Sequence, residues 1–343
     1  MKKVVFYDDI RETDFKPNEL LDAYLEITEK EAKKYFIKSE VLKGRECPAC
    51  HAVTEKNKKA FSKFGLDYYE CAKCGSLYIS PCPTDKAIDN YYRNSEASSY
   101  WKNTLSRNTE DKRKEKIVEP RIQWIVDTVN EHLKNIDSYV DFNTNNSYFI
   151  DRILKYLERV REKVIVNPRF DGINNYNNRV KIIEDKSGNY DVDIKPDSIG
   201  VISLFEVIDR TSDMDKLLHS INRMLKPGGL CFVTTLSISG FDLQVLRKES
   251  KSIFPPDRIN VLSLEGIEIL FKKYGFDCIE LSTPGLLDVE IVASVLRDKP
   301  SLDLPGFIKY FITKRGTETH GAFQEFLQMN RLSSYVRAIF RKL

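Results

Sequence analysis

The sequence lacks any long apolar run and any strong excess of charge. No stretch of its 343 residues approaches the roughly 18 apolar residues that a membrane-spanning helix needs. The net charge is only +3, which argues against the broad basic surface of a nucleic-acid-binding protein. The first nine residues begin like a signal peptide, but Asp8 and Asp9 interrupt them before an apolar core forms. We therefore expect a cytoplasmic protein without a membrane span.

What is present is typical of a globular protein. Hydrophobic residues make up 41% of the chain and charged residues 31%, a balance that allows a sizeable core. The length suits one large domain with appendages, or two domains. The seven cysteines are better interpreted as thiols or metal ligands than as disulfides, because a cytoplasmic protein is kept reduced.

Four of the cysteines form two CxxC motifs, Cys47-Pro-Ala-Cys50 and Cys71-Ala-Lys-Cys74, with twenty residues between them. A two-residue spacer lets both thiolates of a motif reach one tetrahedral Zn²⁺, and Gly75 gives the second turn backbone freedom. We predict a structural zinc ribbon with these four ligands. The alternatives are two unrelated pairs of reduced cysteines or a redox site, but a tetrathiolate leaves no free thiolate to react.

The residues around the two CxxC motifs do not favour a nucleic-acid partner. Basic and acidic side chains are mixed there: Lys56, Lys58, Lys59 and Lys63 with Glu46, Glu55, Asp67 and Glu70. Such a mixture indicates a solvated surface rather than a phosphate-binding one. The remaining cysteines, Cys82, Cys231 and Cys278, have no partner at ligand spacing and are predicted to be packing residues.

The stretch from Ile199 to Thr235 carries the clearest fold signal. Its apolar run Val201–Phe205 predicts a strand, which is followed by Glu206 and by an amphipathic segment with apolar residues at helical spacing. A Pro-Gly-Gly turn then ends the helix and leads into a second strand, Leu230–Thr234. This strand–helix–strand crossover is the unit of a parallel sheet covered by helices.

The same alternation extends on both sides of this crossover. We predict further helices over Pro120–Leu133, Tyr148–Val160 and Leu264–Tyr274. The seven predicted strands are Tyr139–Phe142, Lys163–Asn167, Val180–Glu184, Val201–Phe205, Leu230–Thr234, Phe276–Leu281 and Val289–Leu296. This pattern predicts an α/β, Rossmann-like fold: a doubly wound, mainly parallel sheet with helices on both faces, closed by a late hairpin.

The predicted organisation has five parts. They are an N-terminal helical segment (1–44), the zinc ribbon (45–83), a connector (84–116), the α/β domain (117–298) and a C-terminal helical tail (299–343).

In this order of modules the chain resembles class I S-adenosylmethionine (SAM)-dependent methyltransferases, in particular those of bacterial deoxysugar and surface-polysaccharide gene clusters. The matching segments are 74–78 (CGSLY), Tyr91-Tyr92, 205–208 (FEVI), 225–229 (LKPGG), 240–242 (GFD) and 283–290 (TPGLLDVE). The resemblance covers about residues 47–342. It implies SAM as cofactor and the strand order 3-2-1-4-5-7-6, with the last strand antiparallel.

The cofactor motifs of that family are altered in this chain. Aligned on Asp141, the loop has Asn143, Asn145 and Ser147 where the family has three glycines that let the backbone approach the cofactor. Where an acidic residue holds both ribose hydroxyls, Asn167 is neutral. Together with Phe205, these residues are the remnant of the SAM pocket that the resemblance implies. We expect SAM to bind weakly or not at all.

The family's histidines are replaced as well. Its two Glu-His pairs are here Asp209-Arg210 and Asp257-Arg258, and its Ser-Ser-His is Ser333-Ser334-Tyr335. Arginine cannot act as a general base because it does not deprotonate. Glu206, Asp209 and Tyr335 remain as weak candidates for proton transfer.

Two hypotheses follow. The first is a methyltransferase-fold protein that is catalytically impaired and acts as a binding or partner subunit in carbohydrate or surface-glycan biosynthesis. It would bind a carbohydrate or nucleotide-sugar ligand, or form a homo-oligomer or a hetero-oligomer with an active methyltransferase. The alternative is an active SAM-dependent methyltransferase that acts on a sugar or a nucleotide-linked sugar.

Overall fold

The computed structural model describes residues 14–15, 17–53, 56–133, 136–142, 147–156, 160–168, 176, 180–185, 190 and 192–343. Its α-helices are α1 (Asn18–Phe36), α2 (Asp85–Asn94), α3 (Glu96–Tyr100), α4 (Ser106–Asn108), α5 (Glu110–Arg113), α6 (Glu119–His132), α7 (Ser147–Tyr156), α8 (Met214–Met224), α9 (Phe241–Leu246), α10 (Leu264–Lys273), α11 (Asp288–Asp298), α12 (Gly306–Lys314) and α13 (Thr317–Met329). Its strands are β1 (Leu42–Lys43), β2 (Lys58–Lys63), β3 (Leu66–Glu70), β4 (Leu77–Ile79), β5 (Cys82–Pro83), β6 (Ser138–Phe142), β7 (Glu162–Val166), β8 (Lys181–Ile183), β9 (Ile199–Phe205), β10 (Leu225–Leu236), β11 (Asn260–Val261), β12 (Phe276–Ser282) and β13 (Tyr335–Lys342).

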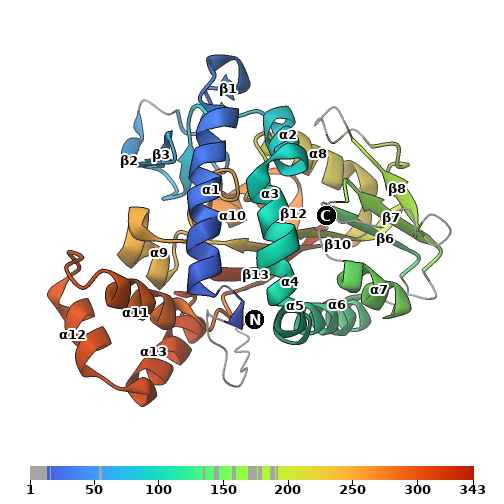
Figure 1. Ribbon diagram of the computed structural model, residues 1–343. Coiled ribbons are helices and arrows are strands. Elements are labelled where there is room, and N and C mark those ends of the chain that lie inside the picture. The colour runs from blue at the N-terminus through green and yellow to red at the C-terminus, as the bar shows by residue number, and fades with distance from the viewer. Residues whose placement is uncertain are drawn as a thin grey trace.

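A seven-stranded sheet forms the centre of the molecule, in the order β12-β13-β10-β9-β6-β7-β8 (Figure 1). Strands β10, β9, β6, β7 and β8 are parallel, whereas β13 is antiparallel to both β10 and β12. Tyr139 of β6 pairs with Val201 of β9, so the predicted pairing of these strands is confirmed. When the seven strands are numbered by their order in the chain, the sheet from β8 to β12 has the order 3-2-1-4-5-7-6. The predicted Rossmann-like fold is therefore confirmed.

The prediction for the seventh strand was wrong. Residues Val289–Leu296 lie within helix α11 rather than in a strand. Their β-branched content suggested a strand, but Val289, Val292, Ala293 and Leu296 are buried at the i, i+3, i+4, i+7 spacing of one helix face. The seventh strand is β13, so the predicted C-terminal tail is helical only in α12 and α13 and ends in a strand of the central sheet.

Helices cover both faces of the sheet, as its strand sequences require. In β9, Val201 packs under α6 and α7, whereas Ile202 and Leu204 pack against α8 and α10. Alternate residues of a strand point to opposite faces, and both faces here are apolar because both are covered. This is the three-layer arrangement that the strand–helix alternation predicted (Figure 1).

The Pro-Gly-Gly turn shapes the start of β10. Gly228 has a φ of +78°, a conformation that glycine adopts without strain. A Cβ atom on Gly229 would lie 2.9 Å from the Lys226 carbonyl oxygen and 3.1 Å from that of Gly200. The turn therefore needs both glycines, and the strand register shifts between Leu225 and Leu230 as a result.

The N-terminal part is built onto the α/β domain rather than beside it. Strands β2, β3 and β4 form a sheet whose fourth strand, β11, comes from the α/β domain. Helix α1 packs on the same side, where the rings of Phe36 and of Tyr91 in α2 are in contact with centroids 5.4 Å apart. Helices α3 to α6 and two π-helical turns, Trp101–Leu105 and Lys114–Val118, then carry the chain to the central sheet.

The junction before β13 is held by a buried acidic side chain. Asp288 accepts hydrogen bonds from the Ser334 backbone nitrogen (2.7 Å), the Ser333 hydroxyl (2.5 Å) and the Gln324 amide (2.8 Å). A Cβ atom on Gly240 would lie 2.2 Å from Ser334 Cα. Segments 240–242 and 283–290, which carry part of the family resemblance, therefore meet where they position the last strand.

None of the helices within the described ranges is long and apolar enough to cross a membrane.

Candidate functional site

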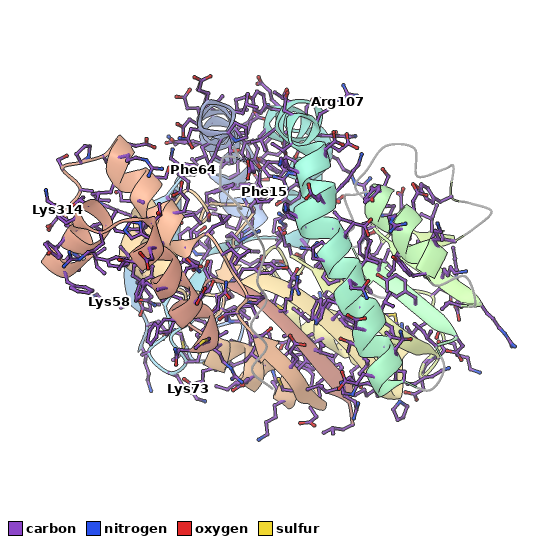
Figure 2. The ribbon with its side chains drawn as sticks, turned by 90° about the horizontal axis from the view of Figure 1, so that it is seen from below. Phe15, Lys58, Phe64, Lys73, Arg107 and Lys314 are labelled. Atoms are coloured by element: carbon purple, nitrogen blue, oxygen red, sulfur yellow. The ribbon has the colours of Figure 1, made fainter. Side chains whose placement is uncertain are left out.

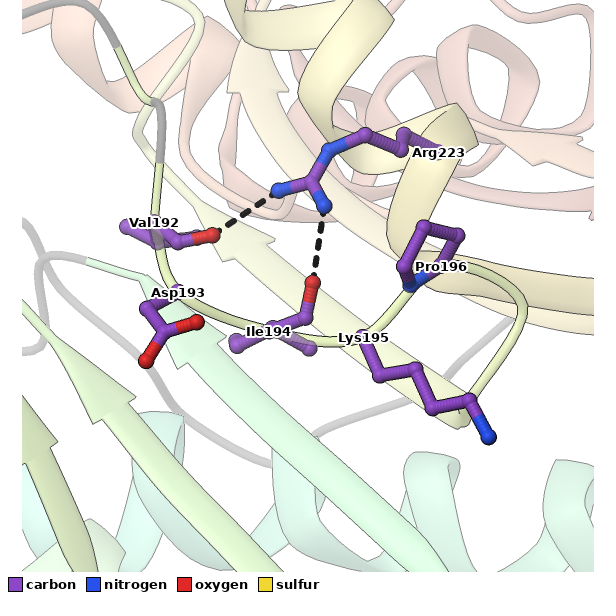
Figure 3. Close-up of a pocket in the computed structure, with 6 residues that line it drawn as sticks. All are labelled: Val192, Asp193, Ile194, Lys195, Pro196 and Arg223. Atoms are coloured by element: carbon purple, nitrogen blue, oxygen red, sulfur yellow. Dashed lines mark hydrogen bonds between the residues drawn. The ribbon is translucent and has the colours of Figure 1, made fainter.

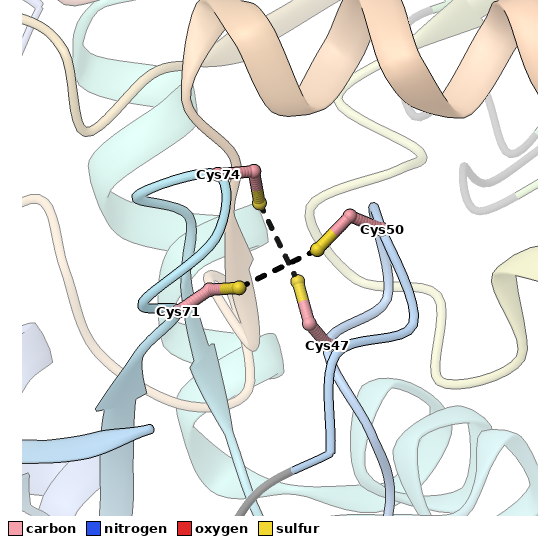
Figure 4. Close-up of side chains that lie close together, drawn as sticks. All are labelled: Cys47, Cys50, Cys71 and Cys74. Atoms are coloured by element: carbon pink, nitrogen blue, oxygen red, sulfur yellow. Dashed lines mark hydrogen bonds between the residues drawn. The ribbon is translucent and has the colours of Figure 1, made fainter. Parts of the chain in front are cut away.

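The four cysteines of the CxxC motifs come together in one cluster (Figure 4). Each motif forms the same turn: the amide four residues after the first cysteine donates to that cysteine's carbonyl oxygen at 2.9 Å. Those amides belong to His51 and Gly75, which have φ values of 57° and 72°. The two turns, one before and one after the β2–β3 hairpin, thereby aim four sulfur atoms at a common centre.

The distances between the sulfur atoms fit a tetrahedral metal. Cys47 Sγ and Cys74 Sγ are 3.7 Å apart, Cys50 Sγ and Cys71 Sγ are 3.4 Å apart, and all four lie within 4.8 Å of one another. A Zn²⁺ ion with four bonds of about 2.3 Å separates its sulfur ligands by about 3.8 Å. The four cysteines would hold such an ion, which would supply a structural cross-link.

The protonation of the thiols also fits a cation. A hydrogen bond from Cys47 lowers the pKa of Cys74 to about 4, whereas burial raises the pKa of Cys50 to about 11. Thiols this close cannot all ionise without positive charge between them, and metal ligation requires thiolates.

The cysteine cluster packs against the start of helix α10. The Ser263 backbone nitrogen donates to the Ser76 hydroxyl at 3.0 Å, and the Ser263 hydroxyl donates to the Cys74 carbonyl oxygen. A Cβ atom on Gly266 would lie 2.2 Å from Ser76 Oγ, so only glycine allows this approach. The ribbon therefore braces the helix layer of the α/β domain.

A second group of functional candidates lies where β9 ends. Glu206 follows that strand with a φ of +57°. Its carboxylate lies 3.3 Å from the Arg210 guanidinium and 3.2 Å from that of Arg258. Burial opposes ionisation here, but Arg258, Arg210 and Arg121 together hold the pKa of Glu206 well below its usual range.

The two Asp-Arg pairs of the sequence, Asp209-Arg210 and Asp257-Arg258, meet in this same place. Arg258 lies 3.4 Å from Asp209 and Arg210 lies 3.8 Å from Asp257, so each arginine bonds to the aspartate of the other pair as well as to Glu206. We call these five residues (Glu206, Asp209, Arg210, Asp257 and Arg258) the Asp–Arg network. Its three carboxyl groups and two guanidinium groups partner one another, from the buried Asp209 out to Glu206, whose side chain is 37% exposed.

Asp209 is the most deeply buried member of the network. It accepts a hydrogen bond from the Thr235 hydroxyl of β10. Its own backbone oxygen accepts from the Ile259 amide at 2.9 Å, which ties the two motifs together. Burial raises the pKa of Asp209 to about 6, although Arg258 and Thr235 partly oppose this.

Two tyrosines complete the network; the Tyr91-Tyr92 pair belongs to the family resemblance, whereas the sequence held no signal for Tyr24. Tyr92 of α2 and Tyr24 of α1 both donate hydrogen bonds to Asp257, the latter at 3.4 Å. They are separated from Asp257 by 165 and 233 residues. The N-terminal helices thus cover the end of β9.

Tyr335, the third candidate for proton transfer, lies apart from the network at the first position of β13, opposite Leu236. Burial would raise its pKa, but Arg121 and Arg337 on either side lower it below the ordinary value. The Arg121 guanidinium also lies 4.6 Å from the centre of the Phe205 ring. Arg121 of α6 therefore links Tyr335 to the end of β9.

The described residues of the expected cofactor pocket are largely engaged with the protein itself. Asp141 is buried, and its carboxyl group accepts hydrogen bonds from the hydroxyls of Tyr139 (3.2 Å) and Ser203 (2.5 Å). Burial raises the pKa of Asp141 to about 7. The Phe205 ring packs against Phe149, with centroids 5.6 Å apart. The Asp141 side chain therefore belongs to the interior of the fold, whereas Phe205 is partly buried.

The other predicted cofactor contacts are less complete. Asn167 has a φ of +50°, and its side-chain oxygen accepts a hydrogen bond from the Asp185 backbone nitrogen at 2.7 Å. Asn167 therefore offers no carboxylate to a ribose. Its side-chain oxygen already accepts a hydrogen bond that connects the end of β7 to the segment after β8. Ser147 is the exposed first residue of α7. Asn143 and Asn145 lie outside the described residues.

Two cavities in the described part of the chain are lined by residues other than the candidates. One, of about 460 Å³, lies between residues 192–196 and Arg223, whose guanidinium donates to the carbonyl oxygens of Val192 and Ile194 (Figure 3). The other, of about 470 Å³, lies between α12 and α13.

Comparison with known proteins gives the following matches. Among solved structures, the chain is similar to a putative sarcosine dimethylglycine methyltransferase from Galdieria sulphuraria, with 14% identity, a TM-score of 0.41, and coverage of 65% of this chain and 86% of the other. It is also similar to a SAM-dependent methyltransferase, possibly a histamine N-methyltransferase, from Thermotoga maritima. That match has 16% identity and a TM-score of 0.42, and it covers 71% of this chain and 98% of the other. No curated protein matches the sequence. The family model described as "Methyltransferase domain" matches residues 100–281. That match spans more than half of the 343 residues, and the chain therefore belongs to the methyltransferase-domain family.

Proposed function

We propose that this protein is a member of the methyltransferase-domain family that does not transfer methyl groups and acts as a binding or partner subunit in carbohydrate or surface-glycan assembly. The observation that carries the proposal is the Asp–Arg network. It fills the end of β9 with ion pairs between the residues that replace the family's proton-transfer histidines.

The network leaves poor candidates for acid–base chemistry. A general base works best when its pKa lies near the operating pH, yet the two arginines hold the pKa of Glu206 far below neutrality. Asp209 has a pKa of about 6, but it is buried and already bonded to Thr235 and Arg258. The arginines remain protonated at any working pH.

The cofactor contacts point the same way. A carboxylate makes stronger hydrogen bonds to ribose hydroxyls than a neutral amide does, and Asn167 uses its amide oxygen on Asp185. By contrast, the buried strands, the Pro-Gly-Gly turn and the four cysteines keep the residue types that their structures need. We infer that selection has maintained the fold and the zinc ribbon while the demand for SAM was relaxed.

The ligand class in this proposal rests on the resemblance to methyltransferases of deoxysugar and surface-polysaccharide gene clusters. The ligand would be a carbohydrate or a nucleotide-linked sugar. A hetero-oligomer with an active methyltransferase, or a homo-oligomer, would give a chain without catalysis a role in such assembly.

One observation favours a second candidate function, an active methyltransferase on a sugar or nucleotide-linked sugar. Arg121 and Arg337 lower the pKa of Tyr335, which increases the fraction of Tyr335 that is present as phenolate, the form that can accept a proton. In that case Tyr335 would take the proton of the sugar hydroxyl that accepts the methyl group, and a bound SAM would supply that methyl group.

Two measurements separate these functions. Titration calorimetry with SAM and with S-adenosylhomocysteine should show weak binding or none, and incubation with radiolabelled SAM and a panel of nucleotide sugars should leave the label on SAM. A low-micromolar dissociation constant together with labelled sugar would refute the first function. Tyr335→Phe would then be the decisive variant, because loss of label transfer with unchanged SAM binding assigns the proton transfer to the phenol.

A further inference from the structure

The C-terminal helices α12 and α13 expose an unusual amount of apolar surface. Phe307, Tyr310, Phe326 and Met329 have exposed fractions between 47% and 70%. Together with Leu332 they are five of the nine large hydrophobic residues that are exposed in the described ranges. Exposed apolar patches of this kind mark interaction sites. Figure 1 shows the two helices at one end of the molecule, and Figure 2 shows Lys314 at the same margin.

A groove runs between the two helices. It has a volume of about 470 Å³ and is lined by Phe307, Tyr310, Phe311, Arg315, Thr319, Ala322, Phe323 and Phe326. Neighbouring rings line its floor in contact: the centroids of Phe311 and Phe323 are 4.9 Å apart, and those of Phe323 and Phe326 are 5.9 Å apart. The surface thus offers both a recess and the protruding Phe307 ring, a shape that can fit a copy of itself.

The two helices that border the groove carry exposed charges of opposite sign. Lys314 ends α12 and is followed by Arg315, which lines the groove, whereas Glu318 and Glu325 are exposed on α13, which contains no lysine or arginine. Among the described residues, none of these four side chains forms an ion pair with another residue of the chain. The Arg315 guanidinium lies 5.0 Å from the centre of the Tyr310 ring, a contact that leaves its charge unneutralised, so both signs can pair with charges of a partner.

We propose that the α12–α13 face, meaning Phe307, Tyr310, Ala322, Phe326, Met329 and the groove between them, binds the same face of a second copy of this chain. In a two-fold symmetric interface each patch meets its own copy. A two-fold axis along the groove exchanges its sides, so that the basic side of each copy faces the acidic side of the other. Phe307 of each copy then enters the groove of its partner, where apolar area is removed from water.

An anionic membrane is the other class of surface that aromatic and basic residues can bind, but the charge arrangement favours a second copy. Lipid headgroups of one sign would attract Lys314 and Arg315 and repel Glu318 and Glu325. The proposal is independent of whether the chain binds SAM, because no residue of this face belongs to the Asp–Arg network or to the expected cofactor contacts.

The test uses the full chain and charge reversal on each side of the groove. Sedimentation equilibrium should show a dimer for the natural protein. Lys314→Glu with Arg315→Glu places acid against acid in the dimer, and Glu318→Lys with Glu325→Lys places base against base. Each double variant should therefore weaken dimerisation by about tenfold or more, since each 1.4 kcal/mol of lost interaction is about tenfold. An equimolar mixture of the two should again form a dimer, because each side now faces its opposite.

The matched control is Lys58→Glu with Lys155→Glu, which changes the net charge equally at exposed positions of β2 and α7. It should leave the dimer unchanged. Phe307→Asp, which needs no charge partner, should give a monomer that keeps the circular dichroism spectrum and zinc content of the natural chain. The proposal is overturned if the natural chain stays monomeric at 100 μM, if the mixture fails to associate, or if the chain binds phosphatidylglycerol vesicles through Phe307 instead of dimerising.

Discussion

Replacing Arg258 by methionine should destabilise the protein in a pH-dependent manner, because Arg258 neutralises a buried carboxyl group. The Asp209 side chain is 1% exposed and lies 3.4 Å from Arg258, which is itself 12% exposed. Burial raises the pKa of Asp209 from 3.8 to about 6. At pH 8 its ionised form therefore costs about 3 kcal/mol relative to the unfolded chain, at about 1.4 kcal/mol per pKa unit.

The size of the stability loss depends on which partners Glu206 and Asp209 keep after Arg258 is replaced. Breaking a buried ion pair by removing one partner costs about 3–5 kcal/mol. Glu206 keeps Arg210 and Asp209 keeps Thr235, so we expect the lower end, about 3 kcal/mol at pH 8. The pKa of Asp209 is higher in the folded chain than in the unfolded chain, so the free energy of unfolding falls as the pH rises from about 4 to 6. Without Arg258 the folded-state pKa of Asp209 rises further, and the fall continues to higher pH. The loss should be much smaller at pH 5.

Urea denaturation followed by tryptophan fluorescence at pH 5 and pH 8 measures the effect. Asp209→Asn should rescue the Arg258→Met variant at pH 8, because an amide does not ionise. Arg297→Met is the control, since its ion pair with Glu290 lies at the surface with 62% of the arginine exposed, and it should change stability by less than about 0.5 kcal/mol. A loss below about 1 kcal/mol at pH 8, or an equal loss at both pH values, would refute the reasoning.

Three further predictions concern the metal, the cofactor and the ribbon. Protein purified without added metal should contain about one zinc per chain by elemental analysis, since four thiolates at this spacing retain the ion. The Cys74→Ser variant should lose the zinc. A natural chain free of zinc would contradict the assignment of the four cysteines as zinc ligands. A quadruple variant should bind SAM about tenfold or more tightly in calorimetry, because one charge-assisted hydrogen bond contributes about 1–2 kcal/mol beyond a neutral one. Its substitutions are Asn143→Gly, Asn145→Gly, Ser147→Gly and Asn167→Glu. No gain in affinity would mean that something else closes the SAM pocket. Gly266→Ala should cost about 1–3 kcal/mol in urea denaturation through overpacking against Ser76; if Gly266→Ala is neutral, the cysteine-bearing segment does not pack tightly on α10.

Much of the fold could be predicted because its signals are local. Six strands of the central sheet were predicted from short apolar runs bounded by turns, and the Pro-Gly-Gly turn marked the crossover between β9 and β10. Residues 289–296 misled because β-branched residues dominate a segment whose buried positions follow helical spacing. Strand β13 was missed because Arg337 and Arg341 alternate with its apolar residues, a pattern that also suits a basic helical tail.

The candidate site was predictable in its parts but not in its assembly. The four cysteines could be assigned from spacing alone, because a CxxC turn is a local structure. That Arg258 reaches Asp209 and Arg210 reaches Asp257 depends on how loops at two strand ends meet, which no local pattern reports. The bonds from Tyr24 and Tyr92 span 165 residues or more, so only the folded chain reveals them.

The position of β13 also has a consequence for how this chain is made. The strand lies between β10 and β12, yet it is synthesised about 50 residues after β12 and about 100 residues after β10. Until residues 335–342 leave the ribosome, both neighbours present unpaired backbone edges, which are open to pairing with other chains. Folding of the central sheet is therefore completed by its last-made strand. A nascent chain halted before Tyr335 would be prone to aggregate or to be degraded, however well the β2–β3–β4 part with its four cysteines had already formed.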